Sequence, residues 1–129
     1  MSKYLGIDYG DKRIGIAISD EEGRFAFPRD VVLNEQGKLQ ECLDKIIEKE
    51  NISAIIVGLP LNFRMKDTAQ TTKVRRFGKF LQEKFHKEVI FENEILSTKE
   101  SERFGGSTKE MIDASSAALI LQSYLSRLK

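Results

Sequence analysis

The chain has 129 residues, 40% of them hydrophobic, and this size suits one compact domain spanning residues 1–129. We find neither the roughly 18 consecutive apolar residues of a membrane-spanning helix nor a signal-peptide pattern, so we expect a soluble cytoplasmic protein. The single cysteine and single histidine exclude an internal disulfide and a zinc site of the Cys/His type. Any catalytic metal must therefore be bound by carboxylates.

The formal net charge of +1 hides a local asymmetry. Residues 61–87 contain eight basic and two acidic residues, a local charge of +6, which leaves −5 on the rest of the chain. Such clustering is typical of proteins that bind polyanions, because lysines and arginines that meet phosphates release condensed counterions. A solvated helix face is the alternative interpretation.

Three strands are expected first, at residues 4–8, 13–19 and 24–33. The turns between them contain Gly10 and Gly23, where glycine can supply a positive φ. In the second strand every other residue is isoleucine, from Ile14 to Ile18, the period of a strand with one face on a core. The sequence thus predicts that an antiparallel meander begins the fold.

A helix is expected over residues 35–50, with Asn34 as its N-cap. Its apolar stripe consists of Leu39, Leu43, Ile46 and Ile47. Cys42 lies among these residues, and we expect it to pack in the core rather than to react. The apolar run 53–58 that follows suits a central parallel strand covered by helices.

A loop over residues 58–66 is expected to lead to a second helix, with Asp67 and Gln70 placed like a capping box. A last strand at 88–92 follows, and then a short helix begins at Ser97 and ends at Gly105 and Gly106. The final helix begins at a capping box, 107–110, and runs to about residue 128. The order β-β-β-α-β-α-β-α predicts an α/β fold with a mixed five-stranded sheet flanked by helices.

Three acidic residues stand out at the edges of predicted core elements: Asp8, Glu94 and Asp113. A charged side chain at the end of an apolar strand or in a buried helix is costly without a partner. If the three carboxylates converge, a hard cation such as Mg²⁺ or Mn²⁺ relieves their repulsion and can catalyse phosphodiester cleavage. Taken singly, Asp8 could instead be a turn residue, Glu94 an exposed loop acid and Asp113 a helix-start acid.

Four ordered blocks of sequence resemble the RuvX/YqgF family. They are Gly6-Ile7-Asp8-Tyr9-Gly10-Asp11-Lys12-Arg13-Ile14-Gly15-Ile16-Ala17, Val57-Gly58-Leu59-Pro60-Leu61-Asn62, Asn93-Glu94-Ile95-Leu96-Ser97-Thr98, and Ile112-Asp113-Ala114 with Ala117-Ala118-Leu119-Ile120-Leu121-Gln122-Ser123-Tyr124-Leu125. The resemblance implies a ribonuclease-H-like fold in which Asp8, Glu94 and Asp113 are the catalytic, metal-binding carboxylates. It also implies a nuclease that uses Mg²⁺ or Mn²⁺. The family is described as maturing the 5′ end of pre-16S ribosomal RNA, and it has also been named a Holliday junction resolvase by likeness to RuvC.

The sequence departs from the family pattern in three places. Ile95 replaces the arginine beside the motif glutamate, and Phe63-Arg64-Met65-Lys66 replaces the glycine that usually follows Gly-Leu-Pro-Leu-Asn. The loop before the final helix is short and reads Phe104-Gly105-Gly106-Ser107-Thr108-Lys109. These changes leave the three acids in place and bear on substrate choice and rate.

Basic residues near the expected site are candidates for contacts with nucleic-acid phosphates, since ligands bind at the C-terminal edge of parallel strands in such folds. The candidates are Lys12 and Arg13 in the first turn, Arg64 and Lys66 in the loop after the central strand, and Arg75, Arg76 and Lys79 on the second helix. Ordinary surface charge remains the alternative for each. We expect a monomer or a homodimer.

Three other functions stay open from the sequence. A Holliday junction resolvase would need a dimer to cut symmetrically. The segment Gly6-Ile7-Asp8-Tyr9-Gly10 also resembles the first phosphate loop of actin-like ATPases and sugar kinases, but those bind nucleotide between two such domains. A binding module that kept the fold and lost turnover is the third possibility, and Ile95 is the residue that favours it.

Overall fold

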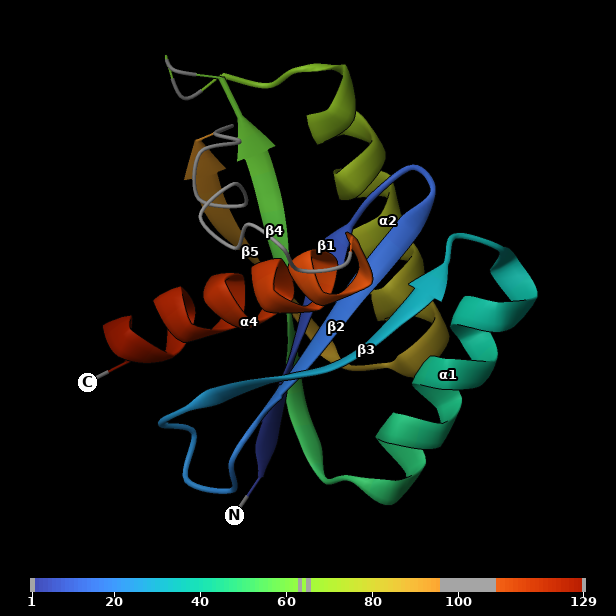
Figure 1. The fold of residues 1–129 in the computed structure, drawn as a ribbon, viewed down its shortest axis with the longest axis vertical. Coiled ribbons are helices and arrows are strands. Elements are labelled where there is room, and N and C mark those ends of the chain that lie inside the picture. Colours follow the sequence, from blue (N-terminus) through green and yellow to red (C-terminus); the bar gives the residue numbers. More distant parts are fainter. Residues whose placement is uncertain (1, 63, 65, 96–108, 129) are drawn as a thin grey trace.

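The computed structural model describes residues 2–62, 64, 66–95 and 109–128. Five strands form one sheet in the order β3-β2-β1-β4-β5. The strands are β1 (Lys3–Tyr9), β2 (Arg13–Ser19), β3 (Ala26–Leu33), β4 (Ile52–Leu61) and β5 (Glu88–Ile95), and the helices are α1 (Gln36–Lys49), α2 (Ala69–Phe85) and α4 (Lys109–Arg127). Helix α4 crosses one face of the sheet, while α1 and α2 cover the other (Figure 1). The predicted element order and mixed five-stranded sheet are confirmed.

Strand direction divides the sheet into two parts. Strands β1, β2 and β3 form the predicted antiparallel meander, whereas β4 runs parallel to both β1 and β5. The C-terminal ends of β1, β4 and β5 therefore meet at one edge of the sheet, which we call the carboxyl edge. This edge is the place where parallel α/β sheets bind ligands.

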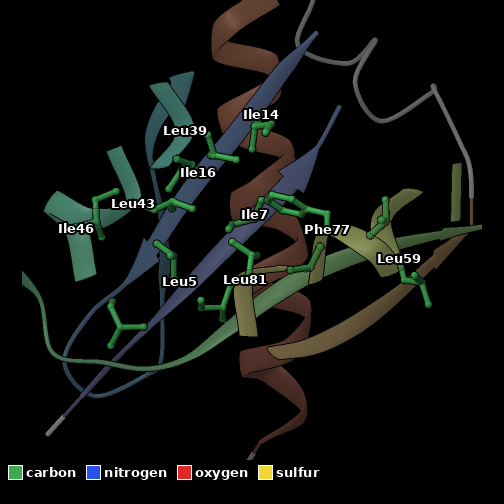
Figure 2. Packing of buried hydrophobic residues seen from close by; sticks show 14 of the residues in the cluster. Leu5, Ile7, Ile14, Ile16, Leu39, Leu43, Ile46, Leu59, Phe77 and Leu81 are labelled. Carbon is green, nitrogen blue, oxygen red and sulfur yellow. The ribbon is translucent and has the colours of Figure 1, made fainter. Parts of the chain in front are cut away.

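Each face of the sheet has its own hydrophobic core. The larger core lies under α1 and α2 and contains Ile14 and Ile16 of β2, Leu39 and Leu43 of α1, and Phe77 of α2 (Figure 2). The smaller core lies under α4. Its strand residues alternate along the chain with strand residues of the larger core. It is made of Ala17, Ala54 and Ile56 of the strands and Ala117, Ile120, Leu121 and Leu125 of the helix. The period-two pattern of the sequence thus decides which side chains each helix layer covers.

The N-caps predicted for α1 and α2 are both wrong. Helix α1 begins after Glu35, and the side chain of Asn34 instead donates to the Gly10 carbonyl at 2.8 Å, tying the helix start to the β1–β2 turn. Helix α2 begins after Thr68, which forms a reciprocal capping box with Thr71. Thr68 and Asp67 are both residue types that cap helices, and the three-dimensional path of the loop decides between them.

Strands β4 and β5 are both longer than the sequence predicted. Gly58 and Pro60 were interpreted as loop residues, but β4 continues to Leu61 because it stays paired with β5 as far as Ile95. Proline is tolerated there because the pairing of β4 with β1 ends at Val57, so that Pro60 has only one strand neighbour. Glu94 consequently lies within β5 and not past its end. The predicted helix from Ser97 and the capping box at 107–110 lie outside the described residues.

Cys42 packs against the larger core, as expected. Its burial, and then the nearby Asp30 carboxylate, raise the pKa of the thiol to about 11, which keeps the unreactive protonated form dominant at neutral pH. Within the described part of the chain, no helix combines the length and the apolar character that spanning a membrane requires.

Candidate active site

Asp8 lies near the C-terminal end of β1, on the face of the sheet that α4 covers. It pairs with Gly15 of β2, and because Ile7 pairs with Val57, Asp8 comes beside Gly58 of β4. Both glycines are buried, whereas Asp8 is half-buried and takes part in an interaction within the protein. Neither of these strand neighbours has a side chain, so neither contributes a side-chain contact to this carboxylate.

The backbone of Glu94 lies two strands away at the same carboxyl edge. Its partner is Pro60 of β4, and it comes two residues after Glu92, which pairs with Gly58. Glu92 therefore belongs to the cross-strand row of Asp8, and Glu94 lies farther toward the carboxyl edge. The structure does not describe the side chain of Glu94.

Helix α4 brings its N-terminal part toward the same edge. Tyr4 of β1 contacts Tyr124, with ring centroids 5.9 Å apart, whereas Gly6 faces Leu121 and Ala117. Moving along β1 toward Asp8 thus corresponds to moving backward along α4, and the backbone of Asp113 comes one helical turn before Ala117.

Of the three predicted carboxylates, the structure describes the side chain of Asp8 alone. The described side chains contain no group of three possible metal ligands, but those of Glu94 and Asp113 are outside this set. Their backbones and the whole of Asp8 come from β1, β5 and α4, three elements that meet at the carboxyl edge. Convergence of the three carboxylates stays a prediction.

Polar contacts that the sequence did not predict hold α4 to the sheet. Glu92, which is 5% exposed, accepts a hydrogen bond from Ser123 Oγ at 2.8 Å and pairs with Arg127. On the other side of the helix, Gln122 accepts from the backbone N–H of Ala26 and donates to the carbonyl of Arg24, both at 2.9 Å. No sequence signal identifies these pairs, because their members are 31 to 98 positions apart.

The loop candidates for phosphate contact lie at the carboxyl edge. Asn62 Oδ1 accepts from the backbone N–H groups of Arg64 and Lys66 at 2.9 and 3.0 Å, so one side chain shapes the loop that carries both cations. Both residues are exposed. Lys12 is exposed in the β1–β2 turn, and Arg13, which begins β2, is half-buried.

The candidates on α2 belong to the opposite layer from α4 and differ from one another. Arg75 forms a two-point ion pair with Asp67, at 3.1 and 3.0 Å, which raises the pKa of the guanidinium. Lys73, a residue of the same helix, pairs with Asp11 at 3.3 Å and links α2 to the β1–β2 turn. Arg76 and Lys79 are exposed. Helix α2 therefore presents exposed cations on the layer opposite the one that faces Asp8.

The RuvX family model, described as Holliday junction resolvase, matches residues 2–127. The chain belongs to the RuvX family. Among its relatives, a protein of Sulfurihydrogenibium sp. is 37% identical, and the alignment covers 99% of this chain and 92% of that protein. A protein of Nitratidesulfovibrio vulgaris is 38% identical, with 95% and 92% covered. Both carry the name "Putative pre-16S rRNA nuclease".

Solved structures confirm the ribonuclease-H-like fold of this RuvX chain. The fowlpox virus Holliday junction resolvase aligns with a TM-score of 0.59 at 15% identity and covers 98% of this chain and 99% of that one. Thermus thermophilus RuvC in complex with a Holliday junction aligns with a TM-score of 0.54 at 16% identity, with 99% and 96% covered. At these identities the likeness concerns the fold alone.

Proposed function

We propose that this RuvX chain, acting as one domain, is a divalent-metal-dependent nuclease that processes the 5′ end of pre-16S ribosomal RNA. Family membership supports the activity, because the family's description and its relatives' name both denote enzymes that hydrolyse phosphodiester bonds. The relatives' name supports the RNA substrate. Such a substrate places the enzyme in the cytoplasm with the assembling ribosome.

The observation that carries the proposal is that β1, β5 and α4 meet on one side of the carboxyl edge. Alternation along β5 assigns positions 92 and 94 to the same face, and Glu92 contacts α4. Asp113 precedes Ala117 by one turn, and Ala117 packs against the sheet near Gly6. Asp8 lies two residues beyond Gly6 on the same face of β1. This arrangement supports a common pocket for Asp8, Glu94 and Asp113.

The donor set fits Mg²⁺ or Mn²⁺. All three residues are carboxylates, and hard divalent cations prefer oxygen ligands. Bound there, such ions lower the pKa of a water molecule and offset the charge that develops on the leaving oxygen. The protein itself holds the acids together against their mutual repulsion, which a cation relieves.

The basic residues would position the substrate without reading its sequence. Lys12, Arg13, Arg64 and Lys66 lie on the turn and loop that border the carboxyl edge. Cations placed there can contact phosphates on either side of the cleaved bond. Arg76 and Lys79 would extend this contact along α2, whereas the Asp67 carboxylate already engages Arg75.

A cleavage assay on a pre-16S 5′ leader RNA tests the proposal, with Asp8→Asn as the decisive variant. Asparagine keeps the size of Asp8 and removes its charge, so we expect cleavage to fall by more than about 100-fold. Asp11→Asn is the matched control, because Asp11 is exposed in the adjacent turn and pairs with Lys73. Equal cleavage by the Asp8→Asn variant and the unmodified chain would refute the assignment.

Holliday junction cleavage is the second candidate, favoured by the family's description. The same preparation is therefore offered a four-way DNA junction, and its mass in solution is measured. Symmetric cutting by a homodimer would favour this substrate, because two strands must be cut by two related sites. RNA binding without cleavage in either metal would instead indicate a module that has lost turnover.

A further inference from the structure

A buried carboxylate on β5 fixes an exposed arginine near the end of α4. The side chain of Glu92 is 7% exposed, and that of Arg127 is 62% exposed. Glu92 pairs with Nη2 of Arg127 through one oxygen and accepts from Ser123 through the other. The guanidinium carbon of Arg127 lies 5.8 Å from the centre of the Tyr124 ring. A buried charge is costly without its partner, so Arg127 is held in one place.

Glu92, which holds the arginine, lies near Asp8 and Glu94 of the candidate active site, whereas Asp113 lies toward the other end of α4. Glu92 shares the cross-strand row of Asp8, two strands away, or about 10 Å at the usual strand spacing. Glu94 follows two residues later on β5, about 7 Å along the strand. Measured along the axis of a duplex, this distance spans about two phosphates of one strand. An RNA strand that ran alongside β5 with one phosphate at Glu94 would thus place another phosphate level with Glu92.

We propose that Arg127 binds a backbone phosphate of the substrate RNA, and that Glu92 and Tyr124 hold its guanidinium in position. The inference rests on the proposed function, since it concerns the substrate of the same site. Of the five donor hydrogens of the guanidinium, the described contacts use only those on Nη2. The remaining donors are on a side chain that is mostly open to solvent. Preorganisation matters because a free arginine loses rotamer entropy when it is immobilised.

RNA binding by the uncleaving Asp8→Asn chain tests this role, using a labelled RNA hairpin with a single-stranded 5′ extension over a series of KCl concentrations. A lost phosphate contact makes the negative slope of log K against log salt shallower by about 0.7 to 0.9. We expect Arg127→Gln to do so and to weaken binding roughly five- to tenfold at 0.1 M salt. Arg24→Gln is the matched control, because Arg24 is 60% exposed and pairs with Glu22. It should leave the slope unchanged.

A purely structural role for Arg127 needs a separate test, since Arg127→Gln also leaves Glu92 buried without its cation. The double variant Glu92→Gln/Arg127→Gln removes both charges, and glutamine can still hydrogen-bond to Ser123. If Arg127 only anchors α4, the double variant recovers the affinity and slope of the Asp8→Asn parent. If Arg127 binds phosphate, the affinity stays low and the slope stays shallow in the double variant, although its melting temperature recovers.

If the single or the double Arg127 variant binds RNA as tightly as the Asp8→Asn parent and with the same slope, the inference is overturned. The nuclease proposal would then remain intact. Failure of the nuclease proposal would show separately, as unchanged cleavage after Asp8→Asn.

Discussion

Gly6 determines how closely α4 approaches the sheet. A Cβ atom at this position would lie 2.7 Å from Cβ of Leu121 and 3.1 Å from the carbonyl oxygen of Ala117. Both contacts are with the part of α4 that packs in the smaller core. Because Asp113 lies on the same helix, the absence of a side chain at Gly6 also bears on the candidate active site.

We therefore expect Gly6→Ala to lower the free energy of unfolding by about 1–3 kcal/mol, the usual cost of overpacking. Urea denaturation measures the change. Gly37→Ala is the matched control, because a Cβ at Gly37 of α1 meets nothing within 4 Å. Alanine there should be neutral or stabilise the chain by up to about 1 kcal/mol. Equal stability of the Gly6→Ala variant and the unmodified chain would contradict the close packing of α4.

Single residues differ in how far the sequence could predict their roles. Asp8 could be singled out because it ends an apolar strand, where a charge needs an explanation. Glu92 could not, because its partner Arg127 is 35 positions away and only the crossing of α4 over β5 brings them together. For Glu94 and Asp113 the sequence predicts a shared pocket, which stays a prediction.

At the scale of elements, Thr71 joins α2 to the end of β4. It is fully buried, and its hydroxyl donates to the carbonyl of Pro60 and accepts from the backbone N–H of Thr68 at 2.8 Å. These bonds close the loop between β4 and α2 at its helix end. The loop carries Arg64 and Lys66, so Thr71 also supports two candidate phosphate contacts.

Thr71→Val keeps the shape of the side chain and removes the hydroxyl, which leaves a buried carbonyl and a helix-start N–H without this partner. We expect the free energy of unfolding to fall by about 1–3 kcal/mol, measured by urea denaturation. Thr72→Val changes the exposed neighbour in the same way and should have little effect. A similar loss in both variants would mean that helix propensity, and not the buried hydrogen bonds, accounts for the change.

The elements themselves were largely predictable because their patterns are strong. Alternating isoleucines identified β2, and the apolar stripe of α1 matched the buried residues Leu39, Leu43 and Ile46. Boundaries were less predictable, since they depend on neighbours. The β4 extension through Pro60 needs β5 beside it, and the side chain of Asn34 was drawn to Gly10 and not to its own helix.

At the scale of the molecule, the excess of basic residues is concentrated in one part of the fold. The local excess of +6 falls on residues 61–87, which form the end of β4, the following loop and α2. Helix α2 starts at the carboxyl edge and covers the face opposite α4. RNA that reaches the candidate active site over this edge would therefore meet the basic face of α2.

Neutralising Arg76 and Lys79 together should weaken RNA binding and make the negative slope of log K against log salt shallower by about 1.5, for two lost phosphate contacts. The Arg76→Gln/Lys79→Gln variant is compared with Lys38→Gln/Lys45→Gln on α1. Lys38 and Lys45 are also exposed, at 58% and 71%, but lie in the part of the chain without a basic excess. The same slope in both double variants would show that α2 makes no specific contact with the RNA.

The central claim is that the carboxylates of Asp8, Glu94 and Asp113 share a cation. A crystal structure of the chain grown with Mn²⁺, with the metal located by its anomalous scattering, tests this claim most directly. We predict a manganese peak within roughly 2.0–2.6 Å of oxygens from all three residues. A peak elsewhere, or any one of the three carboxylates directed away from the metal, would contradict the account.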